Sequence, residues 1–324
     1  MTSNTKRPTN EAAEEILGQY FPVLDHGFVS LVDYMGTDEC IERAARVSYG
    51  YGTRKRNMTR GLIRYLRKNL HTTPSEMVEL KFHCCMPIFV ARQWIRHRMS
   101  STNEFSGRYS LMPMLFYTPE LNQFKKQSLT NNQGRGDNLD MLQYQSALDL
   151  WNQGRKASAS LYENLTSAEV ARELARIDLP LSTYTQWYWK IDLHNLLHFL
   201  KLRVDAHAQW EIQQFGKVIA GMLKRVAPLS YEAWIDYDVC GVRFSREEIN
   251  ILQKIIRTGN FEDSLVEANL SSRDAAEFRT KLISSSEVPD FELDLSQAKS
   301  PDFFSEKMAK AVPQIDQAEN NNGK

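Results

Sequence analysis

The sequence lacks a long apolar run, a Cys-x-x-Cys pair and a glycine-rich nucleotide-binding loop. No apolar stretch approaches the ~20 residues that a membrane-spanning helix needs, which argues against a membrane protein. Cys84 and Cys85 are adjacent and the other two cysteines, Cys40 and Cys240, are isolated, so the spacing of a zinc site is absent. Without a G-x-G-x-x-G or Walker pattern, no Rossmann-type turn is expected.

The chain also lacks an excess of charge of either sign. Its 324 residues contain 40 Lys and Arg against 40 Asp and Glu, for a formal net charge of zero. A surface built for nucleic acid depends on surplus cations, so no nucleic-acid partner is expected. The first eight residues carry no apolar segment of a signal peptide, which favours a cytoplasmic protein without a membrane anchor.

Periodicity and capping residues indicate more helix than strand. Helices are expected at 38–48, 57–69, 87–98, from about 139, and at 167–177, 192–204, 209–226 and 245–258. Strands are expected at 78–85 and 182–191, and a loop at 125–138. Thr73, Pro74 and Glu76 resemble a capping box, whose plain interpretation is a capped helical turn and whose exposed N–H groups could also hold a phosphate. The predicted class is α+β.

What the sequence does contain is a dense polar segment at residues 96–109, directly after an apolar run. It holds Arg96, Arg98 and Arg108 together with His97 and Glu104. Guanidinium groups bind phosphate in a two-pronged geometry, so this segment predicts a site for a phosphorylated ligand. On a helix over 87–98, Gln93 and Arg96 would share a face. The plain alternative is a helix end with arginines at its negative pole.

Two further polar clusters lie downstream. Arg172 and Arg176 are four residues apart, and His194 and His198 have the spacing of a two-histidine metal face, with His207 following. A zincin motif needs Glu after the first histidine, and Asn195 stands there instead. Two alternatives to a ligand-binding enzyme site remain: a metal hydrolase built on the three histidines, and a non-catalytic module that binds nucleotide or nucleic acid through the arginines. We expect no metal.

Residues 96–109 resemble, at every fixed position, the Arg-His-Arg-x-x-Ser-x-Asn-x-x-Ser-x-Arg-Tyr motif of flavin-dependent thymidylate synthases. Residues 71–76, 175–180 and 202–211 are similar to the family's flanking blocks, and the likeness covers roughly 28–235. The resemblance implies a helix-rich fold with a small antiparallel or mixed sheet. It also implies formation of dTMP from dUMP with methylenetetrahydrofolate as carbon donor, NADPH as reductant and FAD as cofactor.

The resemblance further implies the site residues. The dUMP site would contain Gln93, Arg96, Glu104, Ser106, Gly107, Arg108, Arg176 and Arg203. The FAD site would contain His71, Thr73, Arg96, His97, Arg98, Glu104, Asp192, His194 and His198. Arg203 would be the catalytic residue, favouring the ionised pyrimidine as an electrophilic stabiliser. Family members are homotetramers whose active sites are shared between subunits.

The insertion at about 112–145, His198 and the segment after residue 240 depart from the family pattern or extend it. A polar insertion is expected at about 112–145, and His198 stands where some members carry asparagine. The expected organisation is a flexible segment at 1–27, the family domain at 28–240, and a C-terminal helical extension with a loose tail at 241–324. Ser106 is interpreted as a substrate-positioning hydroxyl, because a nucleophilic serine needs a base that the spacing does not supply.

Overall fold

The computed structural model describes residues 6–48, 59–129, 134–266, 268, 271–283 and 288–313. The chain divides into two compact units: one runs up to Tyr231 and resumes at Phe291, and the other spans Glu232–Asp290. Within the described residues no helix is both long and apolar enough to cross a bilayer.

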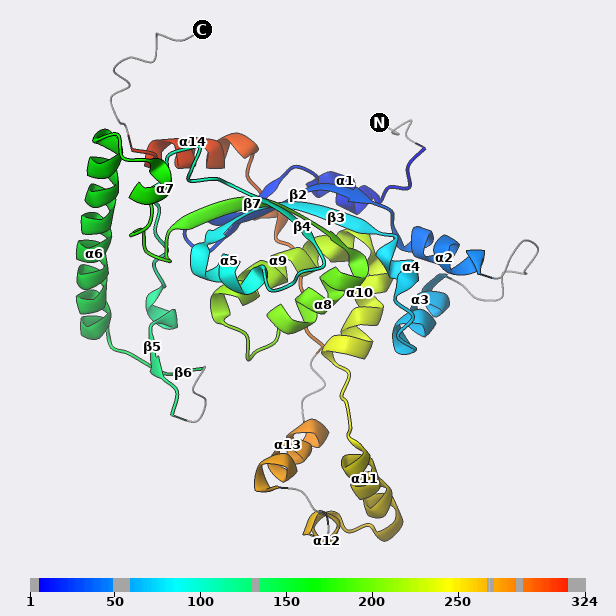
Figure 1. Ribbon diagram of the computed structural model, residues 1–324. Coiled ribbons are helices and arrows are strands. Elements are labelled where there is room, and N and C mark those ends of the chain that lie inside the picture. Colours follow the sequence, from blue (N-terminus) through cyan, green and yellow to red (C-terminus); the bar gives the residue numbers. More distant parts are fainter. Residues whose placement is uncertain are drawn as a thin grey trace. The chain divides into compact units, whose positions relative to one another are not determined.

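The first unit is built on an antiparallel sheet of five strands (Figure 1). The strands are β1 (Tyr20–Val23), β2 (Gly27–Met35), β3 (Glu79–Pro87), β7 (Tyr184–Asp192) and β4 (Ser101–Glu104), in this spatial order. Every neighbouring pair is antiparallel. The predicted α+β class with a small antiparallel sheet is therefore confirmed.

Helices surround this sheet. Those of the first unit are α1 (Glu11–Ile16), α2 (Asp38–Val47), α3 (Thr59–Lys68), α4 (Thr73–Glu76), α5 (Ile88–Trp94), α6 (Met141–Ser167), α7 (Arg172–Ala175), α8 (Leu193–Arg203), α9 (Trp210–Val226) and α14 (Pro301–Ala311). Shorter elements are η1 (Leu121–Gln123), β5 (Lys125–Gln127), β6 (Arg135–Asn138) and η3 (Leu295–Gln297), while α10 (Pro228–Trp234) runs into the second unit.

An aromatic layer joins one face of the sheet to α5, α8 and α9. Trp187 and Trp189 of β7 point to this face, and Trp94 of α5 lies 5.1 Å from Trp189 between ring centroids. Phe199 of α8 stacks on Trp94 at 5.0 Å, and Phe215 of α9 contacts it at 5.8 Å. Burying each large aromatic side chain contributes roughly 2–3 kcal/mol, so this layer fixes the three helices against β7.

Part of the opposite face of the sheet is covered by the returning C-terminal segment. Phe304 of α14 lies 4.7 Å from Phe28 and 5.8 Å from Tyr20 between ring centroids. The backbone of Lys299 exchanges hydrogen bonds with that of Tyr20. The loose tail expected at the end of 241–324 is therefore wrong for α14, because an apolar face of this helix completes the core of the first unit.

The second unit is a small helical body with its own core. It contains η2 (Ile235–Val239, a π-helix), α11 (Arg246–Thr258), α12 (Phe261–Val266) and α13 (Ser272–Ile283). Ile251, Leu265 and Phe278 pack together inside it. The helix expected at 245–258 is confirmed, with Ser245 and Glu248 forming the capping box that starts it.

Several boundaries differ from the sequence prediction. The flexible segment expected at 1–27 instead contains α1 and β1, whose apolar residues are buried. The loop expected at 125–138 contains the paired strands β5 and β6, although residues 130–133 lie outside the described part. The helix expected at 167–177 is divided between the end of α6 and the single turn α7, and residues 57–58 of another expected helix also lie outside the described part.

The fold predicts that α14 contributes to stability through one face only. Phe304 is 3% exposed and Phe303, its neighbour, is 49% exposed. Phe304→Ala should lower the free energy of unfolding by about 3–5 kcal/mol, because it leaves a cavity against the sheet. Phe303→Ala is the matched control and should change it little. Urea denaturation followed by tryptophan fluorescence measures both, and equal losses would contradict the packing of α14.

Candidate active site

The polar segment follows directly from α5. Trp94 is fully buried and ends the helix, with Ile95 as its C-cap, so the helix expected at 87–98 spans only Ile88–Trp94. Gln93 and Arg96 therefore do not share a helical face as predicted. A turn closed by His97 N–H donating to the Trp94 carbonyl carries the chain toward β4. The three basic residues at 96–98 consequently lie on a loop tethered to the aromatic core.

Arg203, the last residue of α8, lies at the centre of the first group of predicted site residues. Its Nε donates to His97 Nε2 at 3.1 Å, and its Nη2 donates to the backbone oxygen of Gln93 at 3.4 Å. A cavity of about 690 Å³ opens beside this contact. Its lining comprises Arg96, His97, Arg98, Met99, Ile191, Asn195, His198, Leu202 and Arg203.

The histidines of this cavity are held neutral. Burial, helped by the charges of Arg203 and His198, lowers the pKa of His97 to about 4. The hydrogen bond from Arg203 agrees, because His97 Nε2 can accept it only while unprotonated. Burial, with His194 and Lys201 next in importance, also lowers the pKa of His198. The positive charge of the cavity therefore comes from its arginines.

A second group of predicted residues lies after β4 and on α7. Arg108 Nε forms an ion pair with Glu173 Oε2 at 2.8 Å, and Ser106 Oγ accepts from the Arg108 backbone N–H at 3.3 Å. A Cβ at Gly107 would lie 2.7 Å from Met112 Sδ and 3.1 Å from Arg176 Cδ, so a larger residue here would displace these two side chains. The structure thus brings Ser106, Gly107, Arg108 and Arg176 together around a tight turn.

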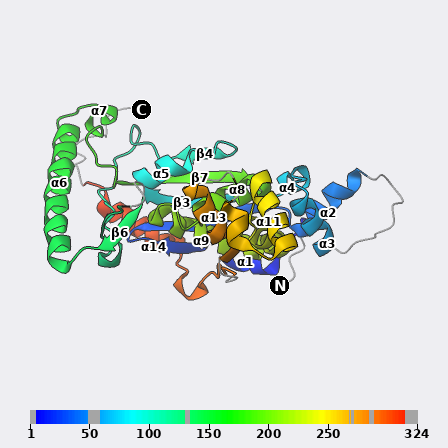
Figure 2. The ribbon, with the colours of Figure 1, turned by 90° about the horizontal axis from the view of Figure 1, so that it is seen from below.

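Glu104 lies between these groups, on β4 beside β7. Its Oε1 accepts a hydrogen bond from Thr185 Oγ1 at 2.7 Å, which fixes the carboxylate against the sheet. The group on α7 lies apart from the group on α8 in both Figure 1 and Figure 2. One chain therefore places the predicted site residues in two separate clusters.

The α4 region supplies the remaining predicted residues. Helix α4 contacts α8, which carries His194 and His198. The predicted capping box is wrong: Thr72 precedes the helix, Thr73 is its first residue, and no side-chain cap is present. Thr73 and His71 are exposed, and the His71 ring meets Tyr65 edge-on at 5.8 Å between centroids.

Helix α8 begins where β7 ends. Asp192 caps it, accepting from the backbone N–H of Asn195 at 3.0 Å and from its side-chain amide at 2.7 Å, as the sequence predicted. These contacts hold the carboxylate of Asp192 and the amide of Asn195 at the entrance of the helix. Asn195 also lines the cavity beside Arg203.

Comparison with known proteins assigns the family. A family model described as "Thymidylate synthase complementing protein" matches residues 30–229. A flavin-dependent thymidylate synthase of Wolbachia pipientis wMel is 45% identical over 282 residues, covering 87% of this chain and 99% of the relative. A flavin-dependent thymidylate synthase of Gluconobacter oxydans (strain 621H) is 48% identical over 253 residues, covering 77% of this chain and 84% of the relative. The chain belongs to the flavin-dependent thymidylate synthase family.

Solved structures agree with this assignment. The crystal structure of a UMP/dUMP methylase, PolB, from Streptomyces cacaoi bound with 5-Br UMP is 30% identical, with a TM-score of 0.61, over 68% of this chain and 98% of that one. Its counterpart bound with 5-Br dUMP is 29% identical with the same TM-score. The family resemblance of residues 96–109 is therefore confirmed, and the matched part of the chain lies in the first unit.

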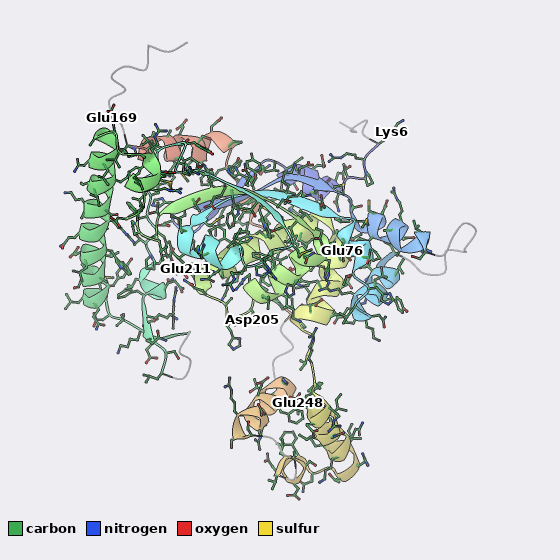
Figure 3. The ribbon with its side chains drawn as sticks, in the orientation of Figure 1. Lys6, Glu76, Glu169, Asp205, Glu211 and Glu248 are labelled. Carbon is green, nitrogen blue, oxygen red and sulfur yellow. The ribbon has the colours of Figure 1, made fainter. Side chains whose placement is uncertain are left out.

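His207, the third histidine of the proposed metal hydrolase, is not among the residues that line the cavity. The His207 side chain is 87% exposed, and its Nδ1 lies 2.8 Å from Asp205 Oδ1 on the loop between α8 and α9. Figure 3 shows Asp205 at the margin of the first unit. Across the described ranges, no three His, Cys, Asp or Glu side chains are grouped to hold a metal ion.

Sequence reasoning missed a buried carboxylate beside the site. Glu211, in the first turn of α9, is 1% exposed and lies inside the first unit (Figure 3). It accepts from Arg135, Tyr117 and Gln209. Residues 209–211 belong to a block that resembles the family, but no role was expected for them. The sequence did contain a signal for its burial, because Glu211 stands between the apolar residues Trp210 and Ile212 at the start of a helix. A buried carboxylate requires hydrogen-bond donors, so such a position predicts a polar network.

The neutral state of His97 predicts how stability depends on pH. An unfolded chain protonates this histidine near pH 6.5, whereas the folded chain, with a pKa of about 4, does not. Acidification from about pH 7.5 to about pH 5 therefore favours unfolding. His97→Gln, which keeps an acceptor for Arg203, should lose less free energy of unfolding over this window than the parent protein. Urea titrations at both pH values test this, with His207→Gln as control, and equal losses in the parent and His97→Gln would contradict it.

Proposed function

We propose that this chain converts dUMP to dTMP, taking the carbon from methylenetetrahydrofolate and the reducing equivalents from NADPH through FAD. The family relationship supports the reaction class, and the names of relatives and structural neighbours support FAD and dUMP. The observation that carries the proposal is the contact of Arg203 with His97 and with the backbone of Gln93 at the edge of the cavity. It joins Gln93 and Arg203, which the family resemblance assigned to the dUMP site, to His97, which it assigned to the FAD site.

The proposed dUMP site uses both clusters of residues. Gln93, Arg96, Glu104, Ser106, Gly107, Arg108, Arg176 and Arg203 would bind the nucleotide. Arg108 and Arg176 suit the phosphate, because guanidinium donates two parallel hydrogen bonds to it. The small volume of Gly107 allows Arg176 to lie close to the turn at Ser106. Ser106 would position the substrate through its hydroxyl.

The residues around α8 fit FAD. His194 Nδ1 is buried and has no hydrogen-bond partner among the described residues, which leaves a polar atom for a bound group. Arg96 and Arg98 line the cavity and suit a diphosphate. The FAD-binding residues would be His71, Thr73, Arg96, His97, Arg98, Glu104, Asp192, His194 and His198. Bound FAD would supply a hydride, so the chain needs no protein nucleophile.

Arg203 would act on the pyrimidine electrostatically. A guanidinium placed at the ring edge stabilises negative charge that develops there. Although burial lowers the pKa of Arg203, its hydrogen bond to the neutral His97 is consistent with a guanidinium that keeps its charge. His97 takes one donor of Arg203 and so fixes the direction of the remaining ones.

The separation of the two clusters supports a shared site. Arg108 and Arg176 lie by α7, whereas Arg203 lies at the end of α8. We infer a homotetramer in which the α7 cluster of one subunit completes the α8 cluster of another. The cytoplasmic location expected from the sequence stays a prediction.

The function is tested by the absorbance spectrum of the purified protein. The expected result is a bound flavin that NADPH bleaches without oxygen and that regains its colour when dUMP and methylenetetrahydrofolate are added, with dTMP formed. A protein that cannot be loaded with FAD, or whose reduced flavin is indifferent to both substrates, would contradict the proposal. Size-exclusion chromatography with light scattering tests the tetramer in the same sample.

Arg203→Ala tests the catalytic assignment. Removing one electrostatic stabiliser typically lowers kcat by about 10²–10³, and we expect a loss in this range. Arg43→Ala, which removes an exposed arginine paired with Glu39 on α2, is the control and should keep full activity. Single-turnover dTMP formation measures both. Near-normal turnover by Arg203→Ala, with FAD bound, would refute the role of Arg203.

A further inference from the structure

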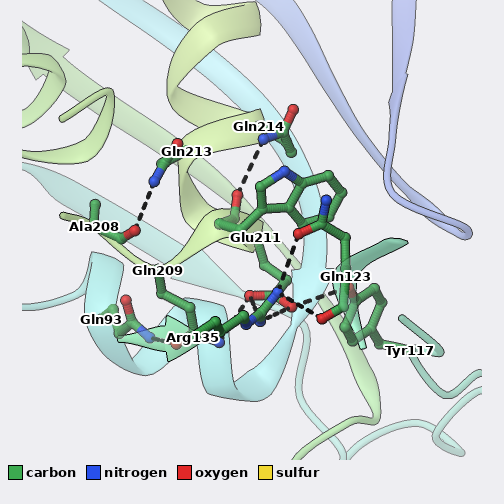
Figure 4. Close-up of polar contacts among 10 residues, drawn as sticks. Gln93, Tyr117, Gln123, Arg135, Ala208, Gln209, Glu211, Gln213 and Gln214 are labelled. Carbon is green, nitrogen blue, oxygen red and sulfur yellow. Dashed lines mark hydrogen bonds and ion pairs between the residues drawn. The ribbon is translucent and has the colours of Figure 1, made fainter. Parts of the chain in front are cut away.

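A chain of hydrogen bonds connects Glu211 to Gln93. Gln209 Nε2 donates to Glu211 Oε2 at 2.9 Å, and Gln93 Nε2 donates to Gln209 Oε1 (Figure 4). The backbone of Gln93 in turn accepts from Arg203. The buried carboxylate is therefore two hydrogen bonds from a side chain that the proposed function places in the dUMP site.

The direction of this chain is set at Glu211. An ionised carboxylate only accepts hydrogen bonds, so Gln209 must turn its NH₂ group toward Glu211. Its carbonyl oxygen then faces Gln93, which must turn its own NH₂ group toward Gln209. The carbonyl oxygen of Gln93 is then the side-chain atom that can accept a hydrogen bond from a ligand. A glutamate at 211 thus makes Gln93 an acceptor toward the substrate.

The carboxylate of Glu211 is held in place by donors from other segments of the chain. Arg135 of β6 donates through Nη2 to both Glu211 oxygens, at 2.5 and 2.7 Å. Tyr117 OH donates to Oε1 at 3.0 Å, and burial together with Glu211 raises the pKa of Tyr117, so the hydroxyl keeps its proton. The position of Glu211 in the first turn of α9 also favours a negative charge. Arg135 lies in the segment expected to be a polar insertion.

We propose that Glu211 is a positioning residue that fixes the amide of Gln93 as a hydrogen-bond acceptor for a donor group of the pyrimidine nucleotide, with Arg135 holding Glu211. This inference rests on the proposed function, because it needs Gln93 in the dUMP site. It assigns a task to the hairpin of β5 and β6, which carries the arginine and forms one wall of a cavity of about 620 Å³ beside Glu211. Gln209 is the second positioning residue.

The proposal predicts that Glu211→Gln reverses the orientation of the Gln93 side-chain amide. The new amide would direct its oxygen to Arg135 and its NH₂ group to Gln209, so Gln209 and then Gln93 would each reverse. Gln93 would present a donor where the nucleotide also has a donor. We expect the Kd and KM for dUMP to rise about tenfold, with kcat changed by less than about threefold.

A double variant tests whether the orientation of the Gln93 amide, and not the loss of a buried charge, causes the effect. In Gln209→Glu with Glu211→Gln, the carboxylate at 209 accepts from residue 211 and from Gln93, which restores the original direction of the Gln93 amide. The exchange keeps the composition and charge of the pair. It should recover most of the dUMP affinity lost in the single variant. If the affinity for dUMP does not recover although circular dichroism shows both variants folded, the proposed hydrogen-bond relay from Glu211 through Gln209 to Gln93 is overturned.

A third pair covers the case in which Glu211→Gln does not fold. Arg135→Gln leaves an acceptor at 211 but removes its main support, so the Kd for dUMP should rise about threefold. Lys126→Gln is the matched control, because it removes an exposed cation from the same hairpin. Equal affinities of these two variants would contradict the role of Arg135.

The measurement is isothermal titration of the FAD-loaded protein with dUMP, followed by steady-state kinetics. The variant Gln93→Ala distinguishes a failure of the proposed dUMP site from a failure of the hydrogen-bond relay. If the parent protein does not bind dUMP, the proposed function fails and the relay fails with it. If Gln93→Ala weakens binding and Glu211→Gln does not, only the relay is overturned. Weaker binding in both variants, with recovery in the exchanged pair, supports it.

Discussion

Strand β7, which lies between β3 and β4, is the constraint on which the site depends. It pairs with β3 along nine residues and with β4 on its other side, so one strand aligns two segments that are distant in the sequence. Its side chains alternate between the aromatic layer and the face covered by α14. Because α8 follows β7 at Asp192, the strand also determines where Arg203 emerges. Displacing β7 would therefore move both Glu104 and the helix that carries the proposed catalytic arginine.

The cavity contains charged arginines and neutral histidines side by side. The arginines of the cavity stay on the loop after α5 and at the end of α8, where water reaches part of each side chain. The histidines between them lose their charge because burial and neighbouring cations both disfavour the protonated form. This arrangement supplies strong anion-binding groups together with neutral acceptors. His97 illustrates it, because it can accept from Arg203 only in its neutral form.

The sequence was sufficient for features determined by local pattern. The motif at 96–109 identified the family, and capping residues located the starts of α8 and α11. Features that depend on tertiary burial were missed. Helix α5 ends at Trp94, whose indole is buried in the core, and Phe304 brings the C-terminal segment back to a sheet whose strands begin at residue 20. No local periodicity encodes a contact between residues so far apart along the chain.

Glu211 shows how such a long-range contact can matter for chemistry. Its partners come from β6, from the segment before η1 and from α9, so no single window of sequence contains the network. A buried carboxylate must be satisfied by donors, and satisfying it orders the donors in turn. The amide of Gln209 has one NH₂ group and one carbonyl, so fixing one end fixes the other. A charge buried outside the cavity can in this way decide which atom of Gln93 faces the substrate.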